Sequence, residues 1–72
     1  MYQEIVMKFI VVESGCFGKP SYTTLTEHPS PPQFAPHVGD LLMHNGEQYC
    51  VIQRAWTRID PIPHLKIYVR KT

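Results

Sequence analysis

The stretch VGDLLMHNGEQYCVIQRAW, from Val38 to Trp56, predicts the central hairpin of a β fold. Asn45-Gly46 divides the stretch, and this pair favours a two-residue type I′ turn because both central residues of that turn need a positive φ. The residues on either side, LLMH and EQYCVIQRAW, are mostly apolar and contain no proline. We therefore expect two antiparallel strands joined at Asn45-Gly46.

Two more strands are expected before this hairpin. Residues 2–13 (YQEIVMKFIVVE) are apolar on both faces, which is typical of a strand in the centre of a sheet or bent across a small barrel. Glycine and proline at residues 14–21 indicate a turn, and the β-branched run YTTLT at residues 22–26 predicts a strand that returns along the first.

A proline-rich segment and a fifth strand complete the pattern. Residues 27–37 (EHPSPPQFAPH) contain four prolines, which exclude a central strand or a helix interior, so we expect an extended connection there. The segment TRIDPIP at residues 57–63 predicts a turn. Residues 64–71 (HLKIYVRK) alternate strictly between apolar and polar side chains, as in a half-buried strand.

Five short strands without a helical period predict one all-β domain over residues 1–72. A small five-stranded antiparallel SH3-like barrel with a long proline-rich loop fits this pattern, because closure removes most edge strands. A strongly curved meander sheet that dimerises through its apolar side is the alternative. A core of this size rarely supplies more than about 3–5 kcal/mol without a disulfide, a metal or a partner chain.

The charge is unevenly distributed along the chain. The net charge is +1, but residues 1–47 hold two lysines against five carboxylates, and residues 48–72 hold five cations against one carboxylate. A nucleic-acid-binding domain is usually more basic as a whole. The apolar run IVMKFIVV is interrupted by Lys8 and is too short to span a bilayer, so we expect a cytoplasmic protein that does not bind membranes.

The residues that could bind a metal or carry out catalysis are dispersed. Structural zinc sites usually show close pairs of ligands, and no such pair is present, so we expect no metal and no other cofactor. In a cytoplasmic protein the two cysteines are reduced thiols. Cys16, in a glycine-rich turn near Lys19, is expected to be more reactive than Cys50, which lies within a strand. We expect that the protein is not an enzyme, because one small barrel rarely provides a catalytic pocket. The candidate metal ligands are Cys16, Cys50, His28, His37, His44 and His64.

Cations and aromatic residues alternate near the C-terminus, and these are the candidate binding residues. One set of three residues lies on one face of the strand that follows Asn45-Gly46, and the second set lies on one face of the last strand. The two sets would form one platform if the two strands paired with these faces on the same, outward side. Tyr, Trp and Arg are typical of protein interfaces, which predicts binding of a host or sister protein, or self-association, through the face with Arg54 and Trp56. The alternative is single-stranded nucleic acid, whose bases stack on aromatic rings. The two sets are Arg54, Trp56 and Arg58, and Lys66, Tyr68 and Arg70.

The pattern P-x-V-G-D, N-G-x-x-Y-x-V-x-x-R-x-W and L-x-I-x-V, between Pro36 and Val69, resembles small uncharacterised all-β proteins carried by bacteriophages and mobile elements. The resemblance covers about half of the chain. Its motifs are structural rather than catalytic, so it implies a fold and an origin but no functional site.

Overall fold

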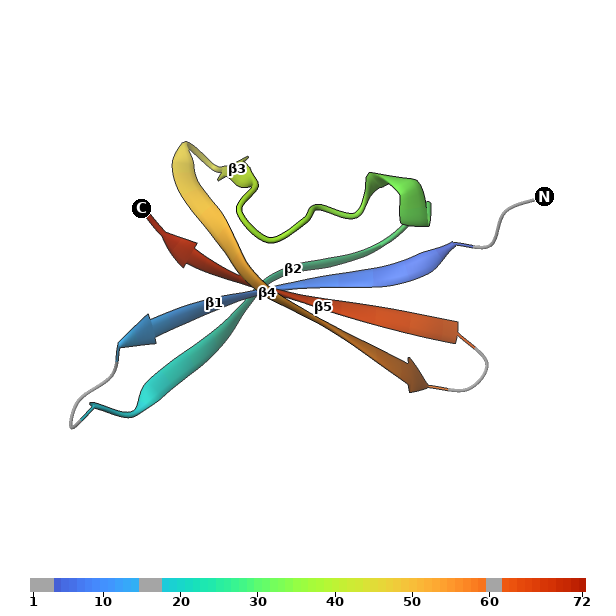
Figure 1. Ribbon diagram of the computed structural model, residues 1–72, viewed down its shortest axis with the longest axis horizontal. Coiled ribbons are helices and arrows are strands. Elements are labelled where there is room, and N and C mark those ends of the chain that lie inside the picture. The colour runs from blue at the N-terminus through green and yellow to red at the C-terminus, as the bar shows by residue number, and fades with distance from the viewer. Residues whose placement is uncertain (1–3, 15–17, 60–61) are drawn as a thin grey trace.

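The chain forms one curled sheet of five strands, in the order β2-β1-β5-β4-β3 (Figure 1). The computed structural model describes residues 4–14, 18–59 and 62–72, without the side chain of residue 59. The all-β class expected from the sequence is confirmed. The elements are β1 (Ile5–Ser14), β2 (Pro20–Ser30), the 3₁₀ helix η2 (Pro32–Phe34), β3 (Leu41–His44), β4 (Glu47–Ile59) and β5 (Ile62–Lys71).

The strand directions are mixed, so the prediction of a purely antiparallel barrel or meander is wrong. β1 pairs with β2, and β4 with both β3 and β5, in antiparallel fashion, but β1 and β5 run parallel. A parallel pair needs a long crossover. Part of that crossover is the proline-rich connection after β2, which carries the chain over one face of the sheet to the opposite edge, where β3 begins (Figure 1). In the described chain, β2 and β3 each have one strand neighbour, which makes the sheet a half-barrel.

The end of β2 and the start of β5 differ from the prediction, because each strand contains a proline at a position where proline is tolerated. β2 extends to Ser30, beyond the predicted end at residue 26, because Pro29 lies in an edge strand that needs no donor on its outer side. The turn predicted over residues 57–63 is shorter, because β4 continues to Ile59 and β5 begins at Ile62. Pro63 is tolerated because β5 pairs with β1 only from residue 64 onward.

The core lies on the concave side of the sheet, which we call the inner face; the opposite side is the outer face. Leu65, Ile67 and Val69 on the central strand β5 are fully buried there, which confirms the alternation predicted for the last strand. Ala35, from the connection between β2 and β3, packs against this core. The core residues are Ile5, Met7, Val11, Tyr49, Val51, Leu65, Ile67 and Val69.

The predicted turn between β3 and β4 is present. Asn45 has a φ of 50° and Gly46 a φ of 80°, the two positive values that a type I′ turn requires. The turn sets the register in which Leu41 pairs with Cys50 and His44 with Glu47. No helix in the described part of the chain is long and apolar enough to cross a membrane.

Candidate binding surfaces

The sheet separates the two predicted sets of binding residues. Arg54 lies opposite Ile67, and Trp56 lies opposite Leu65. Cross-strand partners point to the same side of a sheet, and Leu65 and Ile67 are in the core, so Arg54 and Trp56 project from the inner face. The second set, Lys66, Tyr68 and Arg70, alternates with the core residues of β5 and so projects from the outer face. The six residues therefore form no common platform.

A β-bulge in β4 causes this separation. Val51 pairs with Val69, but Gln53 pairs with Tyr68, so Ile52 is one extra residue in the ladder. With a regular ladder, Arg54 would lie opposite Lys66 and the two sets would share a face. Because the side-chain period of a strand is two, the single extra residue moves every later side chain of β4 to the other face.

Arg54 is engaged within the protein. Its Nη1 donates a hydrogen bond of 3.0 Å to the carbonyl oxygen of Pro36, and the side chain is half-buried. The bond attaches the proline-rich connection to β4. The geometry thus gives Arg54 a structural contact, whereas its predicted role in partner binding stays a prediction.

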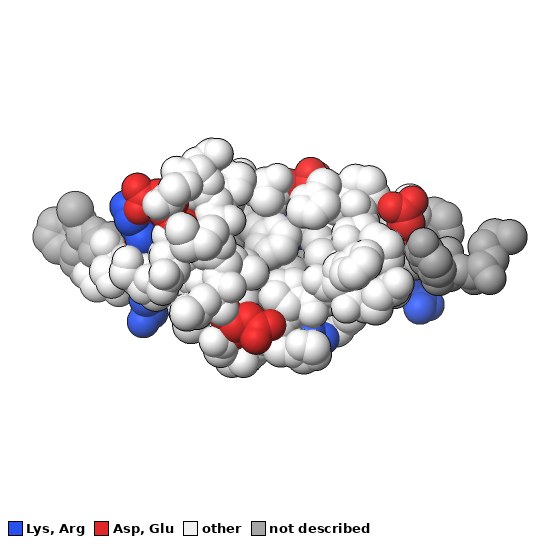
Figure 2. Space-filling model, turned by 90° about the horizontal axis from the view of Figure 1, so that it is seen from above, with Lys and Arg blue, Asp and Glu red and all other residues white. Residues whose placement is uncertain are grey.

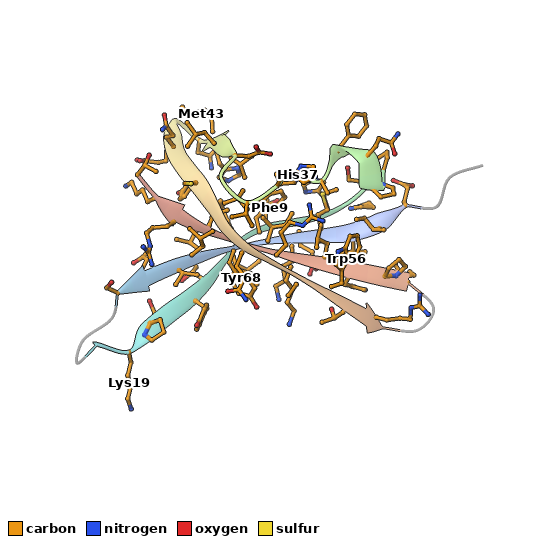
Figure 3. The ribbon with its side chains drawn as sticks, in the orientation of Figure 1. Phe9, Lys19, His37, Met43, Trp56 and Tyr68 are labelled. Atoms are coloured by element: carbon orange, nitrogen blue, oxygen red, sulfur yellow. The ribbon has the colours of Figure 1, made fainter. Side chains whose placement is uncertain are left out.

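Trp56 remains accessible although it shares the inner face with the core. Its side chain is 53% exposed, near the end of β4 (Figure 3). Arg58, two residues further along β4, is also exposed. An exposed tryptophan next to a cation is compatible with either predicted class of ligand, so its accessibility does not decide between them.

A set of exposed apolar side chains lies on the connection and on β3, and we call it the apolar surface. Its members are between 62% and 69% exposed. Figure 3 shows Met43 at the side of the molecule opposite Tyr68. Seen from that side, the surface is mostly uncharged, with several carboxylates and with Lys and Arg mainly at the rim (Figure 2). The apolar surface consists of Phe34, Val38, Leu41 and Met43.

Sequence reasoning missed the apolar surface, although the strand LLMH contained a signal for it. Leu41 and Met43 alternate with Leu42 and His44, so both faces of this short strand carry apolar side chains and one of them had to be exposed. Leu42 packs against the core, so Leu41 and Met43 project from the outer face at the edge of the sheet.

A small cleft lies where the half-barrel is open, between β2 and β3. It has a volume of about 180 Å³, and its walls include Phe9 and His28, whose rings stack with their centroids 5.9 Å apart. Pockets for drug-sized ligands usually measure about 300 Å³ or more, so this cleft is small for such a ligand. His44, from β3, lines the same cleft.

The described candidate metal ligands do not form a metal site. Within the described ranges, no three His, Cys, Asp or Glu side chains gather as a metal site would require. Cys50 is a half-buried free thiol on β4. Cys16 lies outside the described residues, so the predicted absence of a metal and of a disulfide, and the predicted reactivity of Cys16, stay predictions.

Comparison with known proteins yields no match to this chain, whether among family models, curated proteins or solved structures.

Proposed function

We propose that this protein is a non-enzymatic interaction module that binds another protein, or a second copy of itself, through the apolar surface and the exposed Trp56. The observation that carries the proposal is the exposure of Phe34, Val38, Leu41 and Met43, each more than 60% accessible within ten residues of chain. Four large apolar side chains exposed within one short segment of a small protein are typical of a region that another protein covers.

The gain from covering this surface offsets much of the cost of association. Complete burial of a side chain the size of Leu, Met or Phe stabilises by about 1.5–3 kcal/mol. Leu41 and Met43 already have about a third of their surface covered, so each would contribute roughly 1–2 kcal/mol on binding. Four such side chains offset a substantial part of the cost of association, which is about 4–15 kcal/mol.

The edge of the sheet supports the same proposal. In the described chain, β3 pairs only with β4, so its other edge presents backbone donors and acceptors next to Leu41 and Met43. A strand from a partner could extend the sheet there, with main-chain hydrogen bonds for affinity and apolar contacts for specificity. With the cytoplasmic location and the phage or mobile-element origin that we propose for the chain, the partner is a host or sister protein.

Sedimentation velocity tests whether the partner is a second copy. If it is, the sedimentation coefficient of the native protein rises with concentration, and Leu41→Ser/Met43→Ser abolishes the rise. Tyr22→Ser is the matched control, because it removes an exposed aromatic residue from β2, at the other edge of the sheet, and should leave association unchanged. Association that persists in the double variant but is lost in Tyr22→Ser would place the interface on β2 rather than on β3 and would contradict the proposal.

A further inference from the structure

Two lysines lie side by side in the centre of the outer face. Lys8 of β1 is the direct neighbour of Lys66 in the parallel ladder with β5. Adjacent strands are about 4.8 Å apart, and like charges placed directly opposite destabilise a sheet. Among the described residues, the one ion pair within 4 Å joins Lys71 to Glu47, so neither Lys8 nor Lys66 is part of one. This arrangement is unfavourable for the isolated sheet and favourable for binding an anion.

Aromatic side chains lie next to this lysine pair. Tyr68 follows Lys66 by two residues on the same face of β5, and its ring meets that of Tyr22 from β2 edge to face, with centroids 6.1 Å apart. Tyr22 is 61% exposed. A groove of about 280 Å³ crosses the sheet at this point, with side chains from β1, β2, β4 and β5. Its walls are Val12, Tyr22, Ile52, Gln53, Ala55 and Tyr68.

The charges on this face are mostly positive. Arg70 follows Tyr68 by two residues, so cations stand on both sides of that ring along β5. Lys19 also points to the side of the sheet where Tyr68 lies (Figure 3). Among the described strand positions that the register places on this face, Glu27 is the one carboxylate, opposite Lys8. The face is thus complementary to a chain of negative charges.

We propose that the outer face binds single-stranded nucleic acid. Lys8, Lys66 and Arg70 contact phosphates, while bases stack on Tyr22 and Tyr68. The rings favour this ligand over an acidic peptide, because every base has a planar surface that can stack on an aromatic side chain, and acidic side chains have none. Gln53, at the groove, can both donate to and accept from a base edge. The inference is independent of the proposed protein-binding function, which uses side chains of the connection and of β3 at the edge of the sheet.

Fluorescence anisotropy with a labelled oligothymidine of about 15 nucleotides, near the upper end of the site sizes of small barrels, tests the proposal. Lys8→Gln/Lys66→Gln should weaken binding at least about tenfold at ~50 mM salt, and should reduce the slope of log affinity against log salt by about 1.4. The matched control, Arg58→Gln/Lys71→Gln, removes two charges from other positions and should change affinity less than about threefold. An equal loss in both variants would overturn the proposal.

Two single variants separate binding from folding. Lys66→Glu places opposite charges side by side, so the melting temperature should be maintained or raised while oligonucleotide binding is lost. Tyr22→Leu should weaken binding about fivefold or more through lost stacking. Leu41→Ser/Met43→Ser should bind the oligonucleotide like the native protein. No binding by the native protein at ~50 mM salt, or equally tight binding of polyglutamate in competition, would contradict the assignment to nucleic acid.

Discussion

Arg54 on β4 and Pro36 in the connection between β2 and β3 are joined by a hydrogen bond of 3.0 Å, from the guanidinium Nη1 to the carbonyl oxygen. The bond lies next to Ala35, which covers the core. The Arg54 side chain therefore helps to hold the connection against the inner face and to position the neighbouring residues of the apolar surface.

Replacing Arg54 with Met should lower the free energy of unfolding by about 1–2 kcal/mol, because the methionine keeps much of the apolar contact but leaves the Pro36 carbonyl without its donor. Amide exchange should become faster at Phe34 and Ala35, whose N–H groups bond to Pro31 and Pro32. Urea denaturation and hydrogen exchange measure the two effects.

Arg58→Met provides the control for this prediction, since Arg58 is exposed on the same strand and face. It should change the stability by less than about 0.5 kcal/mol, as is usual for surface positions. Equal effects of the two substitutions would show that the contact with Pro36 does not hold the connection.

Gly46→Val should cost about 1–3 kcal/mol, because a β-branched residue is strained at a φ of 80°. No heavy atom lies within 4 Å of the position that an added Cβ would occupy, so the cost comes from the backbone rather than from a clash. Gly46→Asn should cost much less, since asparagine tolerates this conformation. Equal stability of the native protein and Gly46→Val in urea denaturation would disprove the strain argument.

The sequence predicts those parts of the fold that depend on local pattern. The Asn45-Gly46 turn, the core face of β5 and the position of β1 between two other strands all follow from turn chemistry or from the pattern of apolar residues, and the structure confirms them. The parallel pairing of β1 with β5 could not be predicted in this way, because it depends on where the connection crosses the sheet rather than on either strand's own residues.

The candidate site was less predictable, because one bulge decides it. Nothing in the sequence around Ile52 indicates that this residue forms a β-bulge. The bulge places Arg54 and Trp56 on the inner face, whereas Lys66 and Tyr68 lie on the outer face. The pairing of Lys8 with Lys66 is equally hidden, since the two residues lie at opposite ends of the chain.

Ile67→Ala should leave the protein largely unfolded at 25 °C. The side chain is fully buried on the central strand, and such a truncation costs about 2–5 kcal/mol, comparable with the whole stability of about 3–5 kcal/mol for a core this small. Ile62→Ala on the same strand, where the side chain is 44% exposed, should cost less than about 1 kcal/mol. Thermal unfolding followed by circular dichroism distinguishes the two; a folded Ile67→Ala with a native melting temperature would refute this account of the core.

The fluorescence of Trp56 should be quenched by acrylamide in the native protein almost as strongly as in the unfolded chain. Trp56 is the only tryptophan, so the emission reports on this side chain alone, and 53% of its surface is accessible. Strong protection that disappears on unfolding would show instead that the ring is buried, either in the core or in an association of chains. The Leu41→Ser/Met43→Ser variant separates these two cases, since protection by association should be lost in it.

The most direct test of the central claim, that another protein covers the apolar surface, is photo-crosslinking in the cells that encode the chain. Benzoylphenylalanine in place of Met43, which is 68% exposed, should yield a discrete protein adduct on irradiation, and excess native protein should compete it away. The same group in place of Thr57, which is exposed near the end of β4 that does not pair with β3, is the control and should not yield that adduct. No adduct from position 43, or the same adduct from both positions, would contradict the claim.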